Sequence, residues 1–383
     1  MNSRERVLAA LRHEKPDRVP FDVGGLLQSG IHLETYARLR RYLGLPRVKL
    51  KTQTFVTQTA KLDKDFLERL DVDTRFVSRY LSPHTPVEIR EAGNYRIFTD
   101  EWGCERRKPK KGGLYYDIYR HPLDVEDLEK RLKTYEWPDP VDPARFAGLR
   151  QEAKKARERG MAVVLGAHCA GVFEVAWFLR GMESFMLDLG GGSGWAEFLL
   201  DEVLELKMEY WQHALRELGE FVDIVNEADD VAGQDQLLIS PQMYRQTIKP
   251  RHQKLFSCIK KAAPHVKLLL HSDGALRPLI PDLIGIGVDI LNPVQMGCRG
   301  MDPYSLKAEF GDDICFWGGA VDQQHVLLRR DVDEIRHYVR RNMEALAPGG
   351  GWIFAADHIV QADVAAESFM AMWETWRKYG AYQ

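Results

Sequence analysis

Three residues in the second half of the chain have the types and spacing that bind a divalent metal. His271 and Asp273 stand two positions apart directly after the apolar run Val266–Leu270, and His358 follows another apolar run. Residues two apart on an extended segment point to the same side, so His271 and Asp273 can bind one ion. Nitrogen and oxygen ligands around an open position are typical of catalytic zinc. We therefore predict a metal site at His271 and Asp273, with His358 or the neighbouring Asp357 as the third ligand.

An alternative interpretation of the pair is structural. His271 can close the end of its strand through a backbone hydrogen bond. Asp273 can cap the helix that follows, because Asp is one of the preferred residues at a helix N-terminus. In this interpretation the two residues bind no metal.

Three carboxylates that follow the apolar run Val222–Asn226 are candidates for proton transfer. They are Glu227, Asp229 and Asp230. A carboxyl group in a cavity next to another carboxylate has a raised pKa and can act as a general acid. Adjacent residues of an extended segment point to opposite sides, so only one of Asp229 and Asp230 can face such a cavity. The alternative is that the pair belongs to a solvated turn.

These polar residues all follow short apolar runs that alternate with longer helical patterns. The alternation predicts βαβ units and a parallel sheet. No unit opens with Gly-x-Gly-x-x-Gly, which disfavours a nucleotide-binding open sheet and favours a (β/α)8 barrel of the TIM type. Active sites of such barrels lie at the C-terminal ends of the strands. The expected strands are Val19–Asp22, Thr74–Ser78, Ala162–Ala167, Val222–Asn226, Val266–Leu270, Val288–Asn292, Ile314–Gly318 and Gly351–Ala355.

The barrel accounts for the whole chain, residues 1–383, as one domain with two additions. Residues 1–70 form an N-terminal extension with helical segments. Residues 87–120 alternate aromatic and β-branched side chains broken by Gly and Pro, which predicts a β-hairpin insertion.

Composition excludes several classes of protein. The chain is 45% hydrophobic and 28% charged with a formal net charge of −3, as expected of a globular protein with a sizeable core. It has no long basic block, so we expect no nucleic-acid partner. It has neither a signal peptide nor an 18-residue apolar window, so we expect no membrane segment. Its 5 dispersed cysteines indicate a reducing compartment, and we expect a cytoplasmic protein.

Several segments of the chain resemble the uroporphyrinogen decarboxylase superfamily, from about residue 3 to residue 377. They are RERVLAALRHEKPDRVPFDVGG, DDVAGQDQLLISPQMYRQTIKPRHQKLF, HSDG followed by GVDILNPVQ, WGGAVDQQHVL and APGGGWIFAADHIVQADV. The resemblance implies a (β/α)8 barrel and one of two activities. One is decarboxylation in heme biosynthesis, and the other is zinc-dependent exchange of a methyl group with a corrinoid cofactor.

The segment after the first of these motifs distinguishes the two branches. The decarboxylases carry an arginine-rich RQAGRY segment there, whose guanidinium groups bind the carboxylates of an acidic tetrapyrrole. This chain has no arginine between Phe21 and His32. Its acidic strand ends repel a polycarboxylate unless loop cations such as Arg106, Arg107 or Arg299 fold over them. The methyltransferase branch is therefore favoured.

The methyltransferases of this superfamily place zinc on a His-x-Cys pair and a later cysteine. The corresponding positions here are His271, Asp273 and His358, so both cysteines are replaced, one by Asp and one by His. Harder nitrogen and oxygen ligands suit polarisation of an ether or alcohol oxygen better than activation of a thiol. A metal-free site is the alternative.

We therefore expect a zinc-dependent methyltransferase that moves a methyl group from a small methoxy-type donor to a corrinoid. Glu227, Asp229 or Asp230 would give a proton to the leaving oxygen. The chain lacks the corrinoid-binding pattern DxHxxG, so cobalamin is expected as a free cofactor or on a separate corrinoid protein.

Two other functions stay open at this point. One is a decarboxylase of the uroporphyrinogen type, in which Asp229 or Asp230 protonates the carbanion left by the departing carboxylate. The other is a non-catalytic protein that keeps the barrel as a binding scaffold, because a fold does not by itself establish an activity.

Overall fold

A parallel sheet forms the centre of the computed structural model, which describes residues 1–79 and 87–382. Seven strands follow one another in the order β13-β12-β11-β10-β9-β8-β3, and each neighbouring pair is parallel. Their bounds are β3 (Thr74–Val77), β8 (Ala162–Gly166), β9 (Ile224–Ala228), β10 (Lys267–His271), β11 (Ile290–Asn292), β12 (Cys315–Trp317) and β13 (Trp352–Ile353).

The extended segment around Phe21 takes the eighth place and closes the ring. Phe21 forms a parallel bridge with Phe354, just beyond β13, and its carbonyl accepts the backbone N–H of Asp73, just before β3, at 2.9 Å. The N–H of Asp22 donates to the Phe354 carbonyl at 2.8 Å. The predicted (β/α)8 barrel is confirmed, although the predicted strand Val19–Asp22 is held by isolated bridges.

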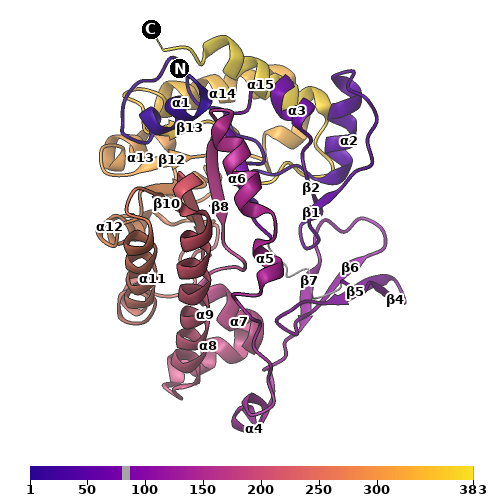
Figure 1. Ribbon diagram of the computed structural model, residues 1–383, viewed down its shortest axis with the longest axis vertical. Coiled ribbons are helices and arrows are strands. Elements are labelled where there is room, and N and C mark those ends of the chain that lie inside the picture. Colours follow the sequence, from indigo (N-terminus) through magenta and orange to yellow (C-terminus); the bar gives the residue numbers. More distant parts are fainter. Residues whose placement is uncertain (80–86, 383) are drawn as a thin grey trace.

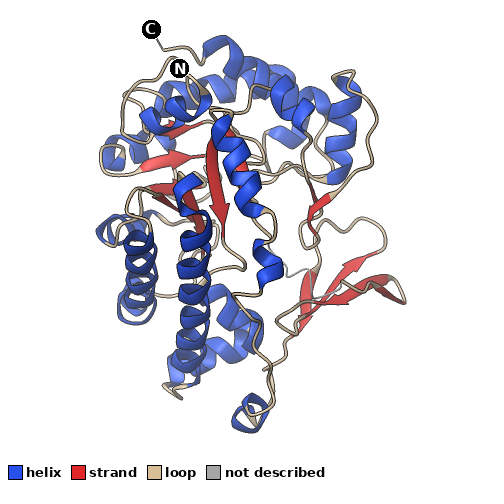
Figure 2. Ribbon diagram, viewed as in Figure 1, coloured by secondary structure: helices blue, strands red, loops and turns tan. Residues whose placement is uncertain are grey.

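Helices surround the sheet, as Figures 1 and 2 show. They are α1 (Ser3–Ala10), α2 (Leu33–Tyr42), α3 (Lys64–Arg69), α4 (Leu128–Leu132), α5 (Pro143–Phe146), α6 (Leu149–Glu158), α7 (Val172–Arg180), α8 (Met182–Gly191), α9 (Trp195–Leu218), α10 (Pro241–Met243), α11 (Lys249–Ala262), α12 (Ile280–Gly285), α13 (Pro303–Phe310), α14 (Val332–Leu346) and α15 (Ala366–Tyr379), with short turns η1 (Gly219–Phe221), η2 (Tyr244–Ile248), η3 (Arg277–Leu279) and η4 (Leu327–Arg329). Within the described residues, none of these helices combines the length and the apolar character needed to cross a bilayer.

Side chains along each strand alternate between the barrel interior and the surrounding helices. The interior cluster contains one or two buried residues from each of the strands β8 to β13 or the residues next to them. Val164, Ile224, Leu269 and Ile290 are among them. Helix α1 adds Val7 and Ala10 to this cluster, and Leu11, directly after the helix, belongs to it as well. Because the N–H of Arg4 bonds to the carbonyl of Gly160 just before β8, α1 covers the N-terminal end of the barrel. The opposite end, where the strands finish, stays available for a site.

The insertion at residues 87–120 is larger than the predicted hairpin. It is a four-stranded antiparallel sheet of β4 (Arg90–Ala92), β5 (Tyr95–Thr99), β6 (Glu105–Pro109) and β7 (Asp117–Arg120). The N-terminal extension also contains an unpredicted hairpin, β1 (Thr52–Thr54) and β2 (Thr59–Ala60). In Figure 1 this hairpin lies between α2 and the inserted sheet.

A fully buried carboxylate ties the first extended segment to β3. Asp73 accepts hydrogen bonds from Nη1 of Arg6 and Nη1 of Arg18, both at 2.7 Å, and from the backbone N–H of Phe21 at 2.8 Å. Two guanidinium groups and a backbone donor thus stabilise one charge that is hidden from water. This cluster supports the point where the barrel closes.

The buried cluster predicts a large loss of stability for Asp73→Asn. Breaking a buried ion pair leaves its partner uncompensated and costs about 3–5 kcal/mol of unfolding free energy. The matched control is Asp71→Asn, which removes the ion pairs of a half-exposed carboxylate with Arg18 and Arg377 and is expected to cost less than about 1 kcal/mol. Urea unfolding of both variants checks this, and equal losses would contradict it.

Candidate active site

A cavity of about 190 Å³ lies at the C-terminal ends of the strands. Asn226 and Ala228 of β9 and His271 of β10 line it, together with His358 from the loop after β13. Residues of the N-terminal extension and of the inserted sheet complete the wall. The cavity is therefore built from segments that are far apart in the sequence.

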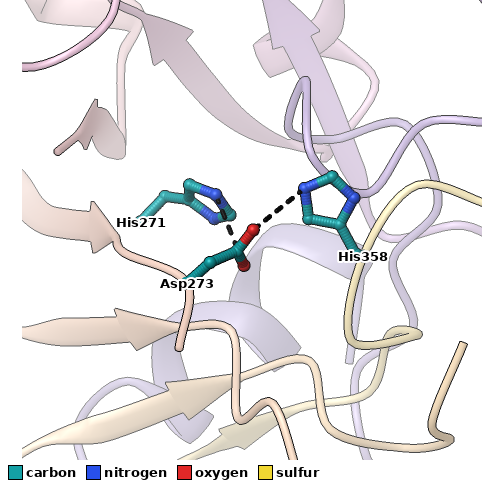
Figure 3. Close-up of side chains that lie close together, drawn as sticks. All are labelled: His271, Asp273 and His358. Carbon is teal, nitrogen blue, oxygen red and sulfur yellow. Dashed lines mark ion pairs between the residues drawn. The ribbon is translucent and has the colours of Figure 1, made fainter. Parts of the chain in front are cut away.

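His271, Asp273 and His358 come together beside this cavity, as the sequence predicts (Figure 3). One nitrogen or oxygen atom of each residue lies within 4.8 Å of the others. Nε2 of His271 is 3.7 Å from Oδ1 of Asp273, and Nε2 of His358 is 3.5 Å from Oδ2 of the same carboxylate. Three potential ligands thus converge on one point.

The chemistry of these three residues fits a divalent cation. Oδ1 of Asp273 is buried and has no hydrogen-bond partner among the described residues, and a cation satisfies such an oxygen. Burial lowers the pKa of His358, more than the charge of Asp273 raises it, so its imidazole is neutral near pH 7. Neutral imidazole and ionised carboxylate are the forms that bind a metal.

A hydrogen-bond chain through two further strands fixes the ring of His271. Nδ1 of His271 lies 2.7 Å from Oδ1 of Asn292, and Nδ2 of Asn292 donates to the carbonyl of Trp317 at 2.8 Å. Because the amide nitrogen is occupied, Asn292 accepts the proton of His271 Nδ1. Nε2 then carries the free lone pair on the side of Asp273. Such outer partners fix the tautomer and orientation of a metal-binding histidine.

Asp230 is the predicted proton donor that the structure places at the cavity. It lines the cavity, and its Oδ1 accepts the backbone N–H of Asp273 at 2.8 Å. Burial and then the charge of Asp273 raise the pKa of Asp230 to about 6. A carboxyl group with this pKa can donate a proton near neutral pH.

Glu227 points away from the cavity, toward helix α9. Its carboxylate forms a buried ion pair with Lys207, with Oε2 at 2.9 Å from Nζ, and accepts the indole N–H of Trp211. Both partners lie on α9, so Glu227 joins the helix to the sheet. The structure gives it a structural position, and we do not retain it as a proton donor.

Asp229 also lies in the helix layer. Its carboxylate accepts the backbone N–H groups of Phe173 and Glu174 at the start of α7, both at 2.9 Å, and lies 2.8 Å from Nε2 of His252. These bonds satisfy free donors at the helix N-terminus. As the alternation of side chains predicts, only one of Asp229 and Asp230 faces the cavity.

Two ionisable residues of the cavity wall do not follow a barrel strand. Glu174 comes from the first turn of α7, and burial, followed by the charges of Asp230 and Asp229, raises its pKa well above the usual value. Arg106 comes from β6, and its Nε donates to Asp100 at 2.6 Å. The sequence prediction considered the residues that follow each strand and therefore missed Glu174, because Glu174 belongs to helix α7.

Of the three loop cations considered in the sequence, Arg106 is the one that reaches the cavity. Arg107 is exposed, with its guanidinium over the rings of Tyr95 and Tyr119, and Arg299 is exposed as well. The wall of the cavity therefore carries a single Lys or Arg side chain among the residues that the structure describes.

One family model and one solved structure agree with this architecture. Residues 100–379 match the family described as Uroporphyrinogen decarboxylase (URO-D). No curated protein sequence matches the chain. Among solved structures, a methyltransferase from Methanosarcina mazei is 20% identical, with a TM-score of 0.63 over 99% of both chains, and shows the same fold. Xylanase 10B from Thermotoga maritima is 14% identical, with a TM-score of 0.37 over 66% of this chain and 91% of its own.

The different positions of Glu227 and Asp230 predict opposite effects of removing their charges. Glu227→Gln leaves the buried Lys207 unpaired and should lower the unfolding free energy by about 3–5 kcal/mol. Asp230→Asn keeps an oxygen for the N–H of Asp273 and removes a partly buried charge beside that of Asp273, so its stability should equal or exceed that of the wild type. Urea unfolding at pH 7.5 compares the two, and a greater loss in Asp230→Asn would contradict this assignment.

Proposed function

Because the chain belongs to the uroporphyrinogen decarboxylase family, we propose that it acts as a zinc-dependent methyltransferase within that family. It moves a methyl group from a small methoxy-type donor to a corrinoid. The observation that carries this proposal is the cluster of His271, Asp273 and His358 beside the cavity. The shared fold with a protein described as a methyltransferase, over 99% of both chains, supports it.

The cavity favours this activity over decarboxylation of a tetrapyrrole. Its volume of about 190 Å³ suits a small molecule, whereas larger ligands occupy pockets of about 300–1,000 Å³. Arg106 is the one cation that lines it in the described part of the chain, and its guanidinium is already bonded to Asp100. A substrate with several carboxylates needs more cations than this wall offers.

In this proposal the metal and the side chains of the cavity have different roles. His271, Asp273 and His358 would hold the zinc, which would supply Lewis-acid polarisation of the donor oxygen. Asn292 keeps Nε2 of His271 directed at the metal position. Asp230, which lines the same cavity, gives its proton to the oxygen that loses the methyl group, so that a neutral alcohol leaves.

The corrinoid must come from outside the chain, because the sequence contains no DxHxxG pattern of its own. It is supplied either as free cobalamin or on a separate corrinoid protein. A corrinoid with reduced Co(I) would accept the methyl group, the electron pair of the broken C–O bond would stay on the donor oxygen, and that oxygen would take the proton of Asp230.

The first test of this proposal is the metal content. The purified protein should bind about one zinc per chain, and His271→Ala and His358→Ala should each abolish this without unfolding the barrel. Asn292→Leu removes the partner of Nδ1 and should weaken zinc binding about 10–100-fold. Elemental analysis and competition with a chelator measure both effects.

The control for the metal test is His325→Ala. His325 is an exposed histidine that pairs with Asp322 outside the cluster, so this variant should keep its zinc. Stoichiometric zinc in the double variant His271→Ala/His358→Ala would overturn the site.

The second test is methyl transfer itself. With zinc, reduced free cobalamin and a methoxy donor, the protein should form methylcobalamin, which is followed by its absorbance. Asp230→Asn should slow this step by about 10²–10⁴-fold with unchanged zinc content, because the leaving oxygen loses its proton donor. Efficient conversion of uroporphyrinogen to coproporphyrinogen, with no methyl transfer, would establish the decarboxylase alternative instead.

A further inference from the structure

Two neutral polar side chains of the cavity wall have no role in the reaction proposed above. Gln28 and Thr57 both line the cavity. Oε1 of Gln28 and Oγ1 of Thr57 are buried and have no hydrogen-bond partner within the described residues. Native structures rarely leave buried polar atoms unpaired, so each such atom beside a cavity indicates a ligand or a bound water.

The loop that carries Gln28 is held in place on both sides. The N–H of Gly24 donates to the carbonyl of Ser29 at 2.9 Å, and the N–H of Leu26 donates to Oγ of Ser29 at 3.0 Å. The carbonyl of Gly30 accepts the N–H of Val360 at 2.9 Å. Since Val360 lies two residues after His358, the Gln28 loop is joined directly to the loop that carries a proposed metal ligand.

The turn that carries Thr57 is anchored in the same manner. It connects β1 to β2, and the carbonyl of Gln58 accepts the N–H of Leu33 at 3.0 Å. The carbonyl of Val56 accepts the N–H of Tyr116, in the segment between β6 and β7, at 2.9 Å. Both neighbours of Thr57 are therefore fixed before any ligand binds, which lowers the entropy cost of recognition.

The types of these side chains define the group they can recognise. An amide and a hydroxyl are uncharged; Oε1 of Gln28 accepts hydrogen bonds, and the hydroxyl of Thr57 both accepts and donates. The ligand group that complements both is a hydroxyl, which can donate to Oε1 of Gln28 and can accept from or donate to Oγ1 of Thr57. A carboxylate has no proton to donate, and it is repelled by Asp230 and Asp273 nearby.

The rest of the wall limits the size and polarity of the ligand. Leu27, Val56, Phe178 and Ile359 give the cavity apolar surface. A cavity of about 150 Å³ lined by apolar side chains holds a benzene ring, and this cavity measures about 190 Å³. The space thus suits one six-membered ring with a few additional atoms.

We propose that Gln28 and Thr57 select the methyl donor by its hydroxyl group. The donor is a compact, uncharged methoxy compound of about one ring, whose hydroxyl donates to Oε1 of Gln28 or Oγ1 of Thr57 while its methoxy oxygen faces the metal ligands. This inference rests on the proposed function and adds the class of substrate to it.

Binding of a matched pair of probes tests the proposal without turnover. 2-Methoxyphenol and methoxybenzene differ by one hydroxyl group, and their affinities for the full-length protein are measured by ligand-observed NMR. The wild type should prefer 2-methoxyphenol. Gln28→Met and Thr57→Val, which keep size but remove the polar oxygen, should each weaken 2-methoxyphenol binding by about 2–10-fold and leave methoxybenzene unchanged.

Two control variants separate recognition from damage to the wall. Thr57→Ser keeps the hydroxyl and should keep the preference. Thr59→Val removes another buried, unpaired hydroxyl of the same hairpin, in a residue that is not among the described cavity-lining ones, and should leave both affinities unchanged. Thermal unfolding verifies that every variant is folded.

The outcomes distinguish this inference from the proposed function. A wild type that binds both probes equally or neither, or a preference that survives in Gln28→Met/Thr57→Val, overturns the role of these residues even if other donors are demethylated. A preference that depends on Gln28 and Thr57, without methyl transfer from any donor, supports the recognition site and overturns the methyltransferase assignment.

Discussion

In a closed parallel barrel each strand presents only every second side chain to the interior, and the residues between them face the helices. This alternation decides which polar groups reach the cavity. In β9, Ile224 belongs to the interior cluster, and Asn226 and Ala228 continue on the same side to line the cavity. Beyond the end of β9, the side chain of Asp230 lies on the same side and also lines the cavity. Glu227, which lies between Asn226 and Ala228 in the chain, forms an ion pair with Lys207 on α9.

The same rule brings the proposed metal ligands together. Leu269 of β10 faces the interior, so His271 and Asp273 follow it toward the mouth of the barrel. Asn292 of β11 and the carbonyl of Trp317 in β12 then complete a hydrogen-bond chain that crosses neighbouring strands. The orientation of His271 thus depends on three consecutive strands in register. A register shift of one residue in β10 or β11 would point the side chain of His271 or Asn292 toward the surrounding helices.

The N-terminal segment links closure of the ring to formation of the site. Phe21 closes the barrel between β13 and β3, supported by the buried charge of Asp73. A few residues later the same segment forms the loop that carries Gln28, which is tied to the loop of His358 through Gly30 and Val360. Stability at the closing point and the position of the cavity wall therefore depend on one stretch of chain.

The sequence by itself determined the barrel, the approximate positions of most of its strands and the residues of the proposed metal site. Its apolar runs are long enough to mark each strand, and the two-residue spacing of His271 and Asp273 is local, so both features are visible without a fold. The (β/α)8 architecture then predicts that the residues after each strand gather at one end. For that reason His358 or Asp357, distant in sequence, could be grouped with His271 before the structure was known, and the resemblance to the family then favoured His358.

Only the tertiary structure decided which carboxylate faces the cavity and which other segments line it. The predicted strand Val222–Asn226, which overlaps β9, is buried along its whole length, and such segments show no alternation of apolar and polar residues that would reveal which side is interior. Asp229 and Glu227 were therefore equivalent to Asp230 in sequence, although they bond to α7 and α9. Gln28 and Arg106 belong to loops and an inserted sheet, whose positions depend on long-range contacts that no local pattern encodes.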